Sequence, residues 1–305
     1  MFGFELFRGD KRQSRPPRRE VSTPSKLTAM ADPDDFDAVR DDRDPLRRAR
    51  RAAELQTHYQ QRATELSRLR KAAIEEAHRD LDMSYTEIAT ALGISKGRIT
   101  QIRGSAPARE RAFFGVGPVA VGVPLRRGTD HRMRTYVDAA DMTAQTQAEG
   151  VLASLSLAAE PFNIEPDLES VPVGDAIVIC GPRSAPVGAS LLAADTHLGF
   201  TREDERWRID DHNSGVKYFS PRLDTPPRDE EFGYFARHRQ DDRVIIHVAG
   251  ITAVGSSGVL HYLQTNVREL FTSEGDVSFS MVVKCSFTSD TTITGSELVA
   301  GPYRW

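Results

Sequence analysis

The chain has 305 residues, of which 39% are hydrophobic and 28% charged, and its formal net charge is −4. This length allows one full α/β domain with a smaller module, and the composition is ordinary for a globular protein with a charged extension. No apolar run approaches the ~20 residues of a membrane span, and the start MFGFELFRGDKR lacks the apolar core and cleavage site of a signal peptide. We therefore expect no membrane contact and a cytoplasmic location.

Residues 1–44 are expected to form a disordered tail. They carry a basic patch around two prolines and then an acidic run over residues 32–37. Few large apolar residues are available to offset the entropy cost of ordering this segment. The large apolar residues at the very start leave docking on a partner, or on the protein's own body, as an alternative.

Residues 45–81 predict one long helix, because they are rich in helix-forming residues and contain no internal Gly or Pro. Apolar residues recur at spacings of three, four and seven and form a stripe of Leu55, Tyr59, Leu66, Leu69 and Ala73. A helix of about 55 Å has little to pack on within a small module. We therefore expect the stripe to pair two chains into a homodimer, and a monomer whose helix folds back on the C-terminal domain is the alternative.

Residues 83–103 (MSYTEIATALGISKGRITQIR) predict two short helices joined by a tight turn. Ser84 and Glu87 have the spacing of a capping box at the start of the first helix. Gly93 is expected to end that helix, and Ser95 to cap the second. Small Ala89 suits a site where two helices cross closely. The pattern is that of a helix-turn-helix with a polar, basic second helix.

This segment resembles the helix-turn-helix of bacterial sigma factors and related transcription regulators. The matching residues are Tyr85, Glu87, Ile88, Ala89, Leu92, Gly93, Ile94, Ser95 and Ile99. The resemblance implies binding to double-stranded DNA. The expected DNA-binding residues, all on or next to the second helix, are Ser95, Lys96, Arg98, Thr100, Gln101 and Arg103. A plain helical hairpin that binds no nucleic acid is the alternative.

The distribution of charge favours a nucleic-acid module in the same part of the chain. Residues 45–111 contain 14 Lys and Arg against 8 Asp and Glu, a balance of +6, whereas residues 112–305 have a balance of −9. Positive charge gathered around one motif of an otherwise acidic protein is typical of nucleic-acid binding.

Residues 112–305 predict an α/β domain with a mostly parallel sheet and an antiparallel edge, because strand and helix patterns alternate. Predicted strands are residues 119–123, 134–137, 176–180, 244–248, 277–287 and 291–298, and predicted helices are 139–159, 187–194 and a third that ends near residue 271. Residues 207–210 and 216–219 predict a β-hairpin insertion. The charged stretch between Pro226 and Asp242 is expected to run over the surface.

Two glycine-containing loops follow the most apolar predicted strands and are the candidate ligand site. In open α/β sheets, ligands bind beyond the carboxyl ends of the strands, where helix N-termini attract anions. The expected ligand-binding residues are Gly181, Pro182, Arg183, Ser184, Gly250, Gly255, Ser256 and Ser257. Neither loop has the spacing of a dinucleotide or P-loop motif. We expect a nucleotide-like or anionic small ligand, and tight strand-to-helix turns without a ligand are the alternative.

The whole arrangement is similar to bacterial regulators that join a sigma-factor-like helix-turn-helix to a Rossmann-like C-terminal domain. Besides the helix-turn-helix, residues 111–119 (RAFFGVGPV), 180–184 and 248–250 with Gly255 carry this likeness. It implies a multidomain chain with a disordered tail (1–44), a long helix plus helix-turn-helix (45–103), a hinge (104–111) and a Rossmann-like sensor or oligomerisation domain (112–305).

The leading hypothesis is therefore a sequence-specific transcription regulator. A nucleotide-processing enzyme that its helix-turn-helix targets to DNA is the competing hypothesis, and contact with RNA polymerase is a third. The candidate acid/base residues do not fall into a recognisable catalytic arrangement: Asp195, His197, Asp210, Asp211 and His212. Cys180 and Cys285 are expected to be buried, and neither they nor the histidines predict a metal site. We expect no cofactor and no catalytic residues.

Overall fold

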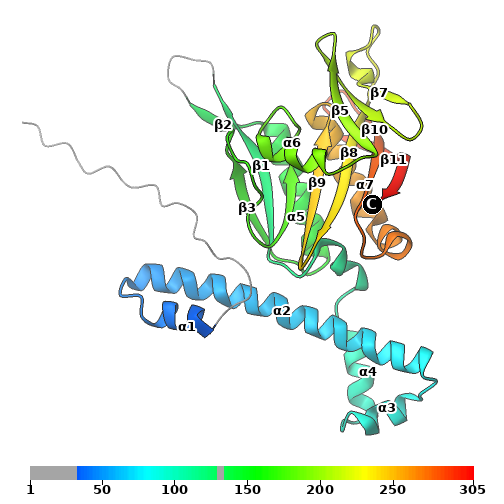
Figure 1. The fold of residues 1–305 in the computed structure, drawn as a ribbon. Coiled ribbons are helices and arrows are strands. Elements are labelled where there is room, and N and C mark those ends of the chain that lie inside the picture. Colours follow the sequence, from blue (N-terminus) through cyan, green and yellow to red (C-terminus); the bar gives the residue numbers. More distant parts are fainter. Residues whose placement is uncertain (1–32, 129–133) are drawn as a thin grey trace, which may run out of the picture.

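The computed structural model describes residues 33–128 and 134–305, which form a helical N-terminal part and a sheet-based C-terminal domain (Figure 1). The N-terminal elements are the helices α1 (Pro33–Arg40), α2 (Pro45–Asp80), α3 (Tyr85–Ala91) and α4 (Lys96–Ser105), followed by the short 3-10 helix η1 (Arg109–Phe114). In Figure 1, α3 and α4 lie at one end of α2 and below the sheet domain. The predicted long helix and the two short helices are confirmed.

The prediction of a disordered tail is wrong for its last residues, whereas residues 1–32 lie outside the described part of the chain. The segment before α2 forms α1, which packs on α2 with the rings of Phe36 and Tyr59 5.5 Å apart. Asp44 then caps α2 by accepting from the amides of Leu46 and Arg47. Phe36 thus finds a partner 23 positions along the chain, which the local composition does not reveal.

The C-terminal domain is built on one eight-stranded sheet and one three-stranded sheet. The large sheet contains β1 (Val119–Arg127), β2 (Thr135–Val137), β3 (Ala159–Ile164), β4 (Asp175–Ile179), β8 (Glu230–Gln240), β9 (Arg243–Gly250), β10 (Phe279–Phe287) and β11 (Ile293–Arg304). The small sheet contains β5 (Leu198–Glu203), β6 (Arg206–Asp211) and β7 (Lys217–Phe219). The pairing of β6 with β7 confirms the predicted hairpin.

The expectation of a mostly parallel sheet is wrong. The strand order is β11-β10-β8-β9-β4-β1-β2, with β3 also pairing with β1. Among the described residues, the parallel pairs are β1–β3, β1–β4 and β4–β9. The sheet is therefore mixed and mostly antiparallel, because β8 enters between β9 and β10 and runs against both.

Strand β8 corrects a second expectation, because the charged stretch before Asp242 does not run over the surface. Tyr234, Phe235 and Ala236 are fully buried in it. The buried charged side chains of this strand have partners from elsewhere in the chain. Arg237 donates to the backbone carbonyl of Phe113 at 2.9 Å, and Glu231 accepts from the hydroxyl of Ser220 at 2.7 Å.

Helices cover one face of the large sheet, and the small sheet with a further helix covers the other. Helices α5 (Ala139–Ser154) and α7 (Ala253–Glu274) pack together on the first face, where Val121, Ile177 and Phe235 are core residues. Helix α6 (Pro186–Ala193) lies on the second face, over a core that includes Val178. This gives three layers, with hydrophobic clusters under α5 and α7, under α6 and under the small sheet.

The predicted hinge over residues 104–111 is shorter than expected. Helix α4 continues to Ser105 and η1 begins at Arg109, so only three residues separate them. Phe113 and Phe114 of η1 are at most 1% exposed and belong to the core of the C-terminal domain. The helix-turn-helix is therefore joined closely to the sheet domain.

Candidate nucleic-acid interface

The corner between α3 and α4 is held by local hydrogen bonds that the sequence predicts. The amide of Ser84 donates to the Glu87 carboxylate at 2.8 Å, and the Glu87 amide donates to the Ser84 hydroxyl at 3.3 Å. The hydroxyl of Ser84 also donates to this carboxylate, and these bonds lower the pKa of Glu87. Gly93 follows α3 with φ +65°, a conformation that glycine adopts without strain.

A small apolar cluster fixes the angle between the helices. It consists of Ile74 from α2, Ile88 and Ala89 from α3, and Ile99 and Ile102 from α4, each at most 7% exposed. Because α4 turns its isoleucines toward this cluster, its polar residues are left exposed. The helix-turn-helix is thus a packed unit with one free helix face.

The six predicted DNA-binding residues are all exposed. They are Ser95, Lys96, Arg98, Thr100, Gln101 and Arg103. Ser95 serves as the cap of α4, because its hydroxyl accepts from the Arg98 amide at 3.2 Å. Arg98 donates to the side-chain carbonyl of Gln101 at 2.6 Å, so these two predicted DNA-binding residues lie side by side. Gly97, which precedes Arg98 in α4, is also exposed and has no side chain.

Arg103 differs from the others because its side chain contacts an aromatic ring of α3. Its guanidinium lies over the ring of Tyr85, 4.2 Å from the ring centroid. This cation–π contact holds the side chain against α3 and leaves it exposed. Sequence reasoning missed this contact, although a tyrosine at the start of α3 and an arginine at the end of α4 are the signal for it.

A buried arginine joins the helical part to the C-terminal domain. Arg111 is fully buried and donates to the carbonyls of Leu155 and Val116, at 3.3 Å and 2.7 Å. It also donates to the carbonyl of Ser156 and, at 2.6 Å, to the side chain of Gln61 on α2. Burial lowers the pKa of this guanidinium. Helix α2 is therefore anchored to the sheet domain at its middle, with the helix-turn-helix at its end.

The apolar stripe of α2 divides into two parts. Leu55 is buried, and Tyr59 packs on Phe36 of α1. Leu66 and Leu69 are 66% and 47% exposed. Only the second part of the stripe, near the anchoring site, is free for contact with another chain.

The two predicted ligand loops lie side by side, because β4 and β9 are parallel neighbours and Ile179 pairs with Val248. Close backbone packing already accounts for two of their glycines. A Cβ atom on Gly250 would lie 2.0 Å from the carbonyl oxygen of Thr252, and one on Gly255 would lie 2.3 Å from that of Phe232.

The other predicted residues of these loops differ in exposure and in hydrogen bonding. The hydroxyl of Ser256 accepts from the Gly250 amide at 2.9 Å, and Ser257 is 7% exposed. The amide of Ser184 donates to the carbonyl of Gly181 at 3.0 Å, whereas Arg183 is exposed and Pro182 half-buried. Binding of a ligand by these loops stays a prediction.

The candidate acid/base residues take part in structural hydrogen bonds. Asp195 accepts from the Tyr234 hydroxyl at 3.0 Å, and Asp211 accepts from the Tyr303 hydroxyl at 2.8 Å. The partners of the others are Asn213 for His197 and Arg208 for Asp210, whereas His212 lies exposed in the turn between β6 and β7. Both cysteines are free and buried. Within residues 33–128 and 134–305, no cluster of three or more His, Cys, Asp and Glu has the geometry of a metal site.

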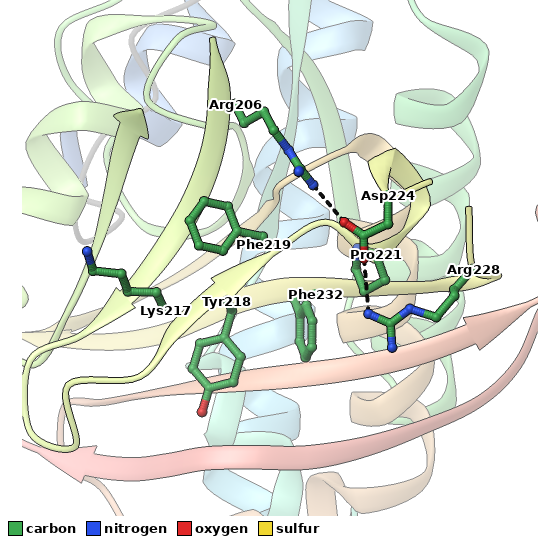
Figure 2. Close-up of a pocket in the computed structure, with 8 residues that line it drawn as sticks. All are labelled: Arg206, Lys217, Tyr218, Phe219, Pro221, Asp224, Arg228 and Phe232. Atoms are coloured by element: carbon green, nitrogen blue, oxygen red, sulfur yellow. Dashed lines mark hydrogen bonds and ion pairs between the residues drawn. The ribbon is translucent and has the colours of Figure 1, made fainter. Parts of the chain in front are cut away.

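Sequence reasoning missed a hollow of about 420 Å³ beside the small sheet (Figure 2). Its lining residues come from β6, β7, the segment around η2 (Pro221–Leu223) and β8: Arg206, Lys217, Tyr218, Phe219, Pro221, Asp224, Arg228 and Phe232. None of them belongs to the predicted ligand loops.

No helix in the described part of the chain is long and apolar enough to cross a membrane. Comparisons of the chain with known protein families, with curated proteins and with solved structures find no match.

Proposed function

We propose that this protein is a cytoplasmic, sequence-specific DNA-binding transcription regulator whose reading element is α4. The observation that carries the proposal is the set of six exposed polar and basic residues on α4 and at its N-cap. The apolar side of α4 packs against α2 and α3, so these six residues remain accessible. A helix of this kind enters the major groove with its N-terminal residues against the base edges.

Arg98 is the principal base reader in this proposal. It lies in the first turn of α4, and its guanidinium is oriented by the bond to Gln101. Arginine pairs with the O6 and N7 acceptors of guanine, and such a contact discriminates by about 1–3 kcal/mol. Lys96 and Arg103, near the two ends of the helix, would contact phosphates.

The exposed part of the α2 stripe supports pairing of two chains through Leu66 and Leu69. Two helix-turn-helices related by a two-fold axis match an operator with inverted half-sites. The C-terminal domain then serves as a sensor or as a further oligomerisation unit, and its anchoring to α2 through Arg111 gives a physical link to the reading element.

Selection from a pool of random DNA duplexes tests the proposal. The full chain is expected to enrich one sequence motif, and a dimer is expected to enrich an inverted repeat of it. The Arg98→Ala variant should enrich a motif that is degenerate at one base pair in each half-site. If the wild-type chain bound the final pool no better than the starting pool, the proposal would be wrong.

A further inference from the structure

The hollow beside the small sheet combines positive charge with aromatic rings. Three of its lining side chains are cations, Arg206, Lys217 and Arg228, and one is an acid, Asp224. The arginines share that acid, which accepts from Arg206 at 3.0 Å and from Arg228 at 3.1 Å. Figure 2 shows these two bonds meeting at one carboxylate. The lining side chains therefore carry a net charge of about +2 within a domain that is acidic overall.

The cations of the hollow retain unused hydrogen-bond donors. Lys217 is exposed, and no acidic side chain in the described part of the chain forms an ion pair with it. The Nε of Arg206 is buried and has no hydrogen-bond partner among the described residues. Arg228 has a longer contact to Glu230, at 3.5 Å, but Glu230 is already paired with Lys284 at 2.7 Å.

The aromatic side chains give the hollow flat apolar walls. Tyr218, Phe219 and Phe232 are each half-buried. The ring of Phe219 lies 5.7 Å from the Arg206 guanidinium, so a ring face and a cation adjoin. In Figure 2 the rings of Phe219 and Phe232 lie between the Lys217 ammonium and the Arg228 guanidinium. A planar ring with an attached anion would satisfy both features.

We propose that this hollow binds a nucleoside monophosphate. The phosphate, with a charge of about −1.5 to −2 at neutral pH, would pair with Lys217, and the base would stack on the aromatic walls. The volume of about 420 Å³ lies within the range of small-molecule sites. This site is distinct from the loops at Gly181 and Gly250, and the proposal holds whether or not α4 binds DNA.

Isothermal titration calorimetry on the full chain tests the site. The probes are the four common ribonucleoside monophosphates, their nucleosides and inorganic phosphate. At least one monophosphate is expected to bind about tenfold more tightly than its nucleoside and than phosphate. Lys217→Met is expected to weaken that binding about tenfold, and Phe219→Leu by a similar factor.

Two control variants locate the binding. Arg222→Met removes one exposed positive charge next to the hollow without touching its lining, and it should leave the affinity unchanged. Arg98→Ala should also leave it unchanged, so failure at this site is distinguishable from failure of DNA reading. The proposal is overturned if no monophosphate binds, if phosphate binds equally well, or if Lys217→Met and Arg222→Met have equal effects.

Discussion

Acidification from pH 7 to pH 5 is expected to destabilise the C-terminal domain through two buried histidines. His238 and His247 are 3% and 0% exposed. The Nε2 of His247 lies 2.8 Å from the carbonyl oxygen of Cys180, so it donates there, and its Nδ1 has no hydrogen-bond partner among the described residues. The Nε2 of His238 likewise has none within them. Burial lowers the pKa of each histidine to about 4.

The size of the effect follows from the difference in pKa between the folded and unfolded states. An unfolded histidine has a pKa of about 6.5, so the unfolded state takes up protons first as the pH falls. The stability of the folded state is therefore full above about pH 6.5 and is lost as the pH falls toward 4. Between pH 7 and pH 5 the protonation of each histidine lowers the free energy of unfolding by about 2 kcal/mol, and the pair lowers it by about 4 kcal/mol. That is a large fraction of the ~5–15 kcal/mol that stabilise a typical domain.

Urea unfolding at pH 7 and pH 5 measures this loss. Burial raises the pKa of Glu231, which acts in the opposite direction, so the test compares the pH dependence of wild type with that of His247→Gln. Glutamine keeps a donor for the Cys180 carbonyl but does not titrate. The variant should lose about 2 kcal/mol less than wild type on acidification, and His212→Gln, at an exposed site, should behave like wild type. Equal losses in wild type and His247→Gln would refute the reasoning.

Three further predictions concern the helical part of the chain. Ala89→Leu should overpack the α3–α4 corner, where Ala89 is 4% exposed, and lower the free energy of unfolding by about 1–3 kcal/mol. Thermal melts of both variants measure this. Ala91→Leu, at an exposed position of the same helix, should leave the stability nearly unchanged, and equal losses of stability in the two variants would contradict the packing account. Leu66→Lys with Leu69→Lys should convert a dimer to a monomer in analytical ultracentrifugation, and a wild-type protein that sediments as a monomer at tens of micromolar would contradict pairing. Arg111→Met should cost about 3 kcal/mol or more in urea unfolding, because several hydrogen bonds are lost around a fully buried group; a cost below about 1 kcal/mol would show that this anchor contributes little.

The helix-turn-helix could be predicted in detail because its determinants are local. Ser84 and Glu87 are three residues apart, and Ser95 caps the helix that begins at the next residue. Gly93 marks the turn through its own conformational preference. Each of these signals is complete within one or two helical turns, so no knowledge of the rest of the fold is needed to read it.

Strand β8 could not be predicted because its charged residues have distant partners. Arg237 bonds to Phe113 and to Asp276, which are 124 and 39 positions away. Glu231 bonds to Thr252, 21 positions away. When those partners are not known, the composition of these residues predicts a charged surface segment. The antiparallel pairing of β8 with β9 and β10 then cannot be predicted either.

The prediction that the two candidate ligand loops lie together is confirmed, but the sequence could not show what their glycines contact. Adjacent parallel strands bring residues 181 and 250 to the same edge of the sheet. Whether a glycine faces a ligand or a backbone depends on packing, and Gly250 and Gly255 face the backbone. The hollow was missed for a related reason, because it is assembled from four segments with no shared motif.

The measurement that most directly tests DNA reading by α4 is a salt titration of binding on the selected operator and on a scrambled duplex. Arg98→Ala should lose about 1–3 kcal/mol of binding free energy on the operator and almost none on scrambled DNA. Lys96→Ala is the matched control for a phosphate contact. Within the described residues Lys96 has no cation–π contact, whereas Arg103 lies over the ring of Tyr85. Lys96→Ala should weaken binding to both duplexes alike and reduce the slope of log affinity against log salt by about one. If Arg98→Ala instead lost affinity equally on both duplexes, α4 would not be the base-reading helix.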